Sequence, residues 1–213
     1  MTDAPDRRDD RPSGPLSGPF DTVLTRADGA IDLALGRPRE GWSKLDVSAD
    51  GFWNSFRAIP WCLPALLVTW LAHGQWLIAE GVRATPGGIV ASLAVIEIVL
   101  WLLTIALFVA LAGPLRLGDR LVPTVIAVNW ASVPIAYARA VPASIALLVG
   151  MGPGIAFVTL VVEVLILVAY WRVLGASLLR GVPMVLGVFL GTLVVGYALS
   201  DWGRHLFGLL PAA

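Results

Sequence analysis

The stretch IVASLAVIEIVLWLLTIALFVALA, residues 89–112, decides the fold class. Its only charged residue is Glu97. A helix needs about 20 consecutive apolar residues to cross the roughly 30 Å of hydrocarbon in a bilayer, so this stretch predicts a transmembrane helix. Four more apolar segments predict further spans: Ala58–Ala79, Leu121–Ala138, Gly154–Gly175 and Val182–Ser200. We therefore predict an all-α, polytopic membrane helix bundle with five transmembrane helices.

Composition supports a membrane protein and excludes several other classes. Only 14% of the 213 residues are charged, against about 25% in a soluble domain. Of the 30 charged residues, 18 lie at or before Arg57. The net charge is zero and there is no basic tract, so we expect no nucleic-acid partner. Cys62 is the single cysteine, which excludes an intramolecular disulfide and a cysteine-based metal cluster.

The uneven charge divides the chain into four parts. Residues 1–18 predict a disordered tail, because they are polar and rich in proline and charge. Residues 19–57 predict cytoplasmic amphipathic or interfacial helices, residues 58–200 the five-span domain, and residues 201–213 an external C-terminal tail.

Two helices are expected before the first span. An amphipathic helix of about four turns follows from apolar residues at helical spacing, namely Phe20, Leu24, Ala27, Ile31 and Leu35. Its charge is as much acidic as basic, which favours docking on protein over binding to lipid. A second, short helix is expected to start near Ser48.

Arginine placement predicts the orientation. Each predicted inner loop carries two arginines and each outer segment one, so the N-terminus is expected in the cytoplasm. Fourteen arginines against one lysine suggest a bacterial chain, placed in the inner membrane with a periplasmic C-terminus. Val141–Met151 is too short to cross, and Arg139 separates it from the third span. We expect that segment to be interfacial or re-entrant.

Two motifs resemble the Yip family, the Ypt/Rab-interacting five-span membrane proteins. They are Asn129-Trp130-Ala131-Ser132-Val133-Pro134 and Tyr170-Trp171-Arg172-Val173-Leu174-Gly175-Ala176. The resemblance covers roughly residues 52–200 and implies five spans with an external C-terminus. The Asp-Leu-Tyr-Gly-Pro signature of eukaryotic members is missing, so interaction with a Rab protein is not expected.

Glu97 and Glu163 are the strongest candidates for a functional site. Both lie inside apolar runs without a lysine or arginine predicted at their depth, where a charge costs about 2.5–3.5 kcal/mol. Protonation lowers that cost, so we expect both to be neutral at neutral pH, or to share one proton if they touch. Asn129 is expected in the same layer, with Thr159 on the face of Glu163. His73 is a weaker candidate, expected at the interface and bonded to water or headgroups.

No catalytic, metal-binding or cofactor-binding signature was found, so we expect neither enzymatic activity nor a cofactor. The main hypothesis is a membrane scaffold or complex component. The alternative is a proton- or cation-coupled transporter or channel subunit that uses Glu97 and Glu163. The expected partners are the lipid bilayer and other membrane proteins or further copies of the chain. Gly187 and Gly191 permit close helix contact, which we expect inside the bundle.

Overall fold

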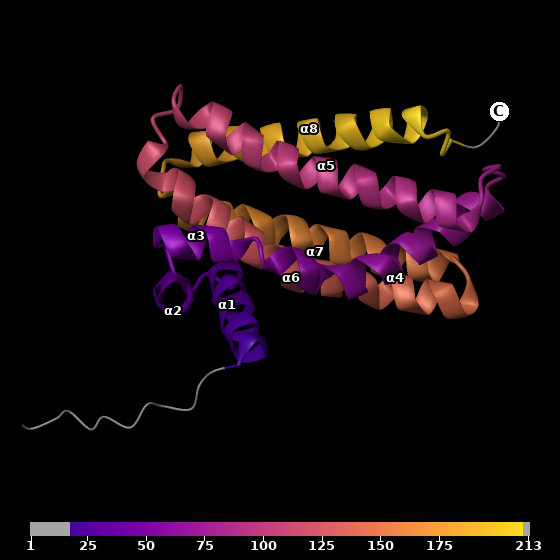
Figure 1. Cartoon of the computed structure of the whole chain (residues 1–213), viewed down its shortest axis with the longest axis horizontal. Helices are drawn as coiled ribbons and strands as arrows, with labels where there is room; N and C mark the ends of the chain where they lie inside the picture. Colours follow the sequence, from indigo (N-terminus) through magenta and orange to yellow (C-terminus); the bar gives the residue numbers. More distant parts are fainter. Residues whose placement is uncertain (1–17, 211–213) are drawn as a thin grey trace, which may run out of the picture.

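The computed structural model describes residues 18–210, and every regular element among them is a helix (Figure 1). Of the predicted tail, all but Gly18 lies outside the described residues. Five helices are long and apolar enough to cross a bilayer, as expected of a multi-pass membrane protein. The eight helices are α1 Pro19–Ala34, α2 Pro38–Lys44, α3 Ala49–Ser55, α4 Ala58–Ala79, α5 Pro86–Ala112, α6 Gly118–Val149, α7 Pro153–Leu178 and α8 Val182–Leu206.

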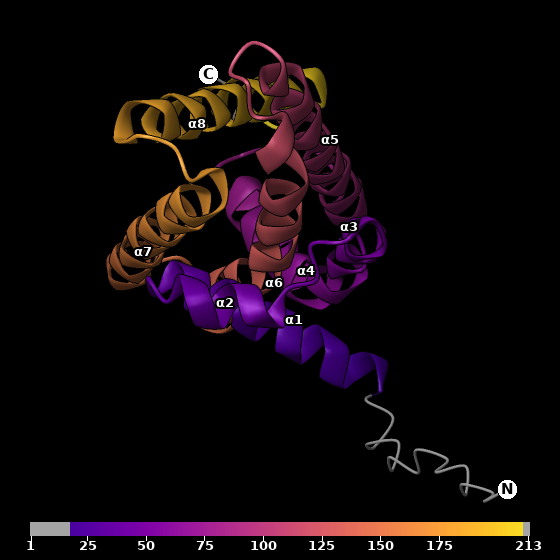
Figure 2. The ribbon, with the colours of Figure 1, turned by 90° about the vertical axis from the view of Figure 1, so that its left-hand side faces the viewer.

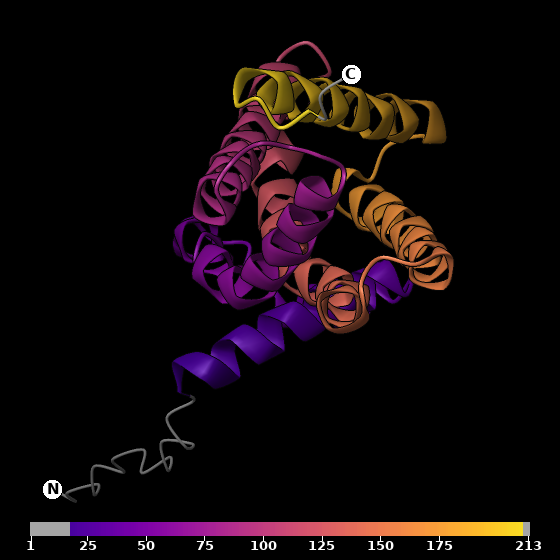
Figure 3. The same cartoon turned by 90° about the vertical axis from the view of Figure 1, so that its right-hand side faces the viewer.

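The five long helices run up and down along one axis. α6 packs on α4, α5 and α7, while α8 packs on α5 and α7 (Figure 2). One end of the bundle carries α2, α3 and the loops α5–α6 and α7–α8, and is called the amino-terminal end below. The far end carries the loops α4–α5 and α6–α7 and the end of α8 (Figure 3).

Residues typical of helix ends mark the turns between the spans. α5 begins with Pro86 after Thr85, whose hydroxyl accepts a hydrogen bond from the backbone of Gly88. α6 ends at Gly150, whose φ of 83° favours glycine, and Pro153 begins α7. The α6–α7 loop is therefore short, which brings the last turns of α6 beside the first turns of α7.

The third span differs from the prediction. α6 is one continuous helix of 32 residues that contains Pro123, Pro134 and Pro142. The prediction that Leu121–Ala138 is a separate, shorter span was wrong, because Arg139 and the following apolar segment continue the same helix. The segment lengthens the third span without adding a crossing, so five spans remain. At the other end of the domain, α8 continues to Leu206, six residues beyond the predicted end of its span.

α1 lies across the direction of the long helices (Figure 1). It packs on α6 and α7 with buried apolar side chains that include Val23, Ala27 and Ala30. Its contact with α2 depends on two glycines, since a Cβ on Gly29 would lie 3.0 Å from the Gly41 carbonyl oxygen. The sequence predicted α1, and it also predicted α3, whose N-cap is Ser48. It did not predict α2.

Lys44 of α2 forms two ion pairs with α1. Its ammonium nitrogen lies 2.5 Å from a carboxylate oxygen of Asp28 and 2.5 Å from one of Asp32. The hydrogen bond from Lys44 lowers the pKa of Asp32, and the hydrogen bonds to Asp28 and Asp32 raise the pKa of Lys44. The Asp32 contribution to stability is therefore present above a pH of about 4 and is lost only as the pH falls through the lowered pKa. The Lys44 contribution is lost as the pH rises through its raised pKa.

Candidate functional site

An ion pair joins α6 and α7 inside the bundle. Nε of Arg139 lies 2.8 Å from Oε1 of Glu163, and Nη2 lies 2.9 Å from Oε2. This two-point contact matches the planar guanidinium to the planar carboxylate. Because arginine stays charged in proteins, this contact gives Glu163 a cationic partner on the neighbouring helix. The prediction that Glu163 has no basic partner was therefore wrong.

Three helices bring charged residues to one depth. Arg139 lies ten residues before the end of α6, Glu163 ten residues after the start of α7, and Glu97 eleven residues after the start of α5. At about 1.5 Å per residue, each of the three residues lies roughly 15 Å from the helix terminus that is located at the far end of the bundle. Glu97 interacts electrostatically with both members of the ion pair. The equal depth of the two glutamates agrees with the prediction, and Arg139 is the residue that the prediction lacked.

Glu97 and Arg139 line a partly open cavity of about 300 Å³. All five spanning helices contribute to its wall. The lining is mainly apolar, with polar or aromatic side chains that include Cys62, Trp101, Thr104, Ser132, Tyr170 and Thr192. Among residues 18–210, no hydrogen bond to the Glu97 carboxyl is found, so this group is left for a ligand, a water molecule or a proton.

Asn129 belongs to a different layer. It lies ten residues before Arg139 on α6, about 15 Å away along the helix. The side chain is fully buried; its Nδ2 donates to Ser55 Oγ at 2.9 Å, and its Oδ1 accepts from Trp101 Nε1 at 3.1 Å. Ser55 in turn donates to the Phe52 carbonyl at 2.7 Å. Asn129 therefore ties α3 and α5 to α6, and its predicted position beside the glutamates was wrong.

Thr159 and His73 do not join the charge cluster. The Thr159 hydroxyl donates to the Ile155 carbonyl of its own helix at 2.9 Å, and the cavity wall does not include it. The ring centre of His73 lies 5.3 Å from that of Trp76, and its Nε2 is buried without a hydrogen-bond partner in the described part of the chain. The expected exposure of His73 to water or headgroups does not hold at this nitrogen.

Sequence reasoning missed two residues that shape the site. Arg139 was treated as the end of a span, although an arginine between two apolar runs also fits a paired charge inside one long helix. Trp101 was not considered, although it lies four residues after Glu97 and thus on the same face of α5. It lines the cavity and bonds to Asn129, so it connects the two polar layers.

No family model matches the chain, and no characterised protein or solved structure is significantly similar to it. The resemblance to the Yip family stays a prediction.

Proposed function

We propose that the protein binds a small organic cation in the cavity and exchanges it for a proton on Glu97, as a transporter or a transporter subunit would. The observation that carries the proposal is the free Glu97 carboxyl in a cavity lined by all five spans. A cavity of about 300 Å³ is at the lower end of the range for small-molecule sites.

The charges of the site favour a proton or an organic cation over a metal ion. Arg139 pairs with Glu163, so Glu97 is the carboxyl of this cluster for which the described residues provide no ion pair. No group of three potential metal ligands occurs in the described residues. Trp101 and Tyr170 are among the lining residues, and a contact between a cation and an aromatic ring strengthens where water is excluded. One proton or one monovalent cation would neutralise the cluster.

Titration calorimetry with benzyltrimethylammonium tests this proposal on the purified full chain in detergent. We expect binding that strengthens as the pH rises, with proton release that appears as a dependence on the ionisation enthalpy of the buffer. Glu97→Gln keeps the shape of the neutral acid and should assemble normally, but it should lose at least tenfold in affinity and all proton release, because it cannot become negative.

The control ligand is neopentylbenzene, which replaces the cationic group with a neutral one of the same shape. It should bind weakly and with no difference between the wild type and Glu97→Gln. Equal affinity of both proteins for the cation, or binding without proton release, would contradict the proposal.

We also propose a bacterial inner-membrane location with the amino-terminal end in the cytoplasm. If Arg139 lies inside the bilayer, the outer end of the bundle keeps only Arg83 and, in the last turn of α8, Arg204 among the described residues, so the arginine bias is stronger than the sequence alone indicated. A reporter enzyme active only in the periplasm should be active when fused after Ala213 and inactive when fused at Gly118. Activity at Gly118 would overturn this orientation.

The scaffold role expected from the sequence remains the second candidate. The side chains of Glu163 and Asn129 support this role, because each is hydrogen-bonded to a residue of another helix. A scaffold predicts no pH-dependent binding of the cation and an unchanged Glu97→Gln variant. The calorimetric experiment therefore separates the two roles.

A further inference from the structure

We infer that a groove between α1, α6 and α7 holds one acyl chain of an anionic phospholipid, with its phosphate on Arg172. The groove has a volume of about 250 Å³ and an almost wholly apolar lining. It is distinct from the proposed cation cavity, although Ile135 and Ile166 contribute to both walls.

The position of the groove identifies the kind of occupant. On α7 its wall extends from Val173 to Val162, eleven residues or about 16 Å of helix. That length is close to half of the roughly 30 Å hydrocarbon thickness, so it matches the chain length of one leaflet. The groove begins beside α1 and continues toward the middle of the bundle. An acyl chain extends in the same way from its headgroup toward the middle of the bilayer.

α1 turns a second apolar face toward this region. Phe20, Leu24, Ile31 and Leu35 are exposed, and Ile31 and Leu35 line the groove. At 100° per residue they lie roughly opposite Gly29, which faces α2. Figure 1 shows α2 farther out along the bundle axis than α1, so the exposed stripe faces the bilayer.

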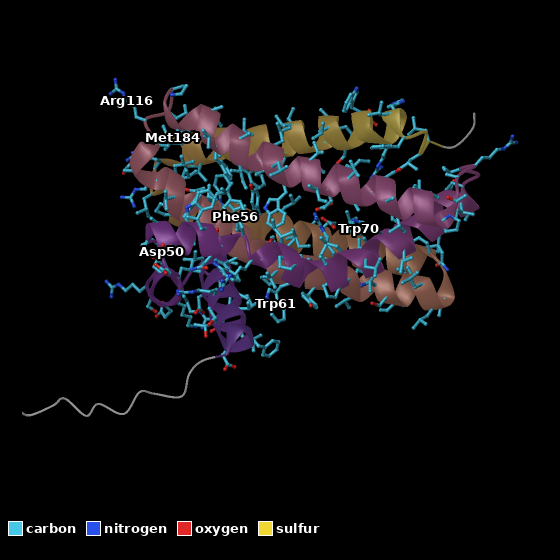
Figure 4. The ribbon with its side chains drawn as sticks, in the orientation of Figure 1. Asp50, Phe56, Trp61, Trp70, Arg116 and Met184 are labelled. Atoms are coloured by element: carbon cyan, nitrogen blue, oxygen red, sulfur yellow. The ribbon has the colours of Figure 1, made fainter. Side chains whose placement is uncertain are left out.

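Trp61 supports this placement of α1. The ring centres of Phe20 and Trp61 are 5.5 Å apart, and Trp61 belongs to the first turn of α4 (Figure 4). Tryptophan is enriched at the level of the lipid headgroups. α1 therefore docks on the bundle and at the same time contacts lipid, whereas the sequence analysis treated these as alternatives.

Arg172 supplies the charge for a phosphate at the start of the groove. Its Nη1 donates to the Ala34 carbonyl at 3.3 Å, which places the guanidinium where α1 meets α7. Ala34 and Leu35 both line the groove. The side chain is exposed, and no carboxylate among residues 18–210 forms an ion pair with it. Its remaining N–H groups are free for the two oxygens of a phosphodiester.

Native mass spectrometry of the full chain with dioleoylphosphatidylglycerol tests the site. We expect one tightly bound lipid per wild-type chain. Arg172→Gln should weaken this binding about fivefold, as expected for one basic residue near an anionic surface. Arg116→Gln removes the same charge from the same end, where Arg116 points away from the bundle (Figure 4), and should bind as the wild type does.

A second pair of variants tests the acyl chain. Ala138→Leu fills the groove and should prevent the binding of the lipid whatever its headgroup, whereas Ala156→Leu places the same side chain on the exposed face of α7, outside the groove, and should have no effect. Equal lipid affinity in Arg172→Gln and Arg116→Gln, or in the two leucine variants, would overturn the proposal. So would a lipid-free dimer as the main species, since a second copy would then cover the groove.

Discussion

Replacing Arg139 with leucine should lower the free energy of unfolding by about 3–5 kcal/mol, the cost of leaving one member of a buried ion pair without its partner. The Glu163 carboxylate would lose both guanidinium hydrogen bonds. The two side chains are 39% and 38% exposed, and Arg139 also lines the cavity between the spans. Water in the cavity can solvate the unpaired carboxyl in part, so we expect a loss at the lower end of this range. Unfolding of the protein in mixed micelles, followed by helical circular dichroism, measures the effect.

The double variant Arg139→Leu/Glu163→Leu should recover most of the loss, because no uncompensated charge remains. Arg180→Leu is the matched control. Arg180 pairs with Asp119 at 3.0 Å at the amino-terminal end of the bundle, where Asp119 lies in the first turn of α6, and an exposed pair contributes at most about 1 kcal/mol. A cost of Arg139→Leu no larger than that of Arg180→Leu would show that the α6–α7 pair does not stabilise the bundle.

The five spans could be predicted because each depends on local composition. A long apolar run has few stable alternatives to a membrane helix, whatever lies beside it. The first span was placed at Ala58–Ala79, the bounds of α4, and the second and fourth spans were within three residues of α5 and α7 at each end. Turn residues such as Pro86 and Gly150 define these ends locally, so they are visible without tertiary contacts.

The error in the third span has a different origin. A hydropathy profile assigns a cost to Arg139 but contains no information about a partner 24 residues away on the next helix. Once Glu163 neutralises the guanidinium, an arginine in mid-span no longer marks a boundary. Two of the wrong predictions, that Glu163 has no partner and that the third span ends before Arg139, are thus consequences of one missed contact.

The layer of Asn129 could not be predicted for a related reason. It was placed near the middle of a span that ended at Ala138, whereas α6 continues to Val149, so Asn129 lies 20 residues, or about 30 Å, from that end of the helix. The contact with Ser55 crosses 74 positions of the sequence. Periodicity predicts which residues share a helix face, but not which faces meet.

Asn129→Leu should lower the free energy of unfolding by about 2–4 kcal/mol. Leucine branches at the same carbon as asparagine, so the main loss is that of two hydrogen bonds at a fully buried site, and its larger volume adds to the cost. The Trp101 N–H loses its acceptor, and Ser55 Oγ loses a donor. An unsatisfied buried polar group costs about 1–3 kcal/mol. The same unfolding titration measures the change, and hydrogen exchange should become faster in α3, which Asn129 holds to α6.

Asn54→Leu is the matched control for this prediction, because the only other asparagine of the chain lies on the exposed side of α3. It should change the free energy of unfolding by no more than about 0.5 kcal/mol and leave exchange in α3 unaltered. Ser55→Ala should fall between the two, since it removes one hydrogen bond but leaves Trp101 bonded to Asn129. If Asn129→Leu were as mild as Asn54→Leu, the Ser55–Asn129–Trp101 network would not be what joins α3 to the spans, and apolar contacts of α3 such as those of Phe52 would have to hold it there.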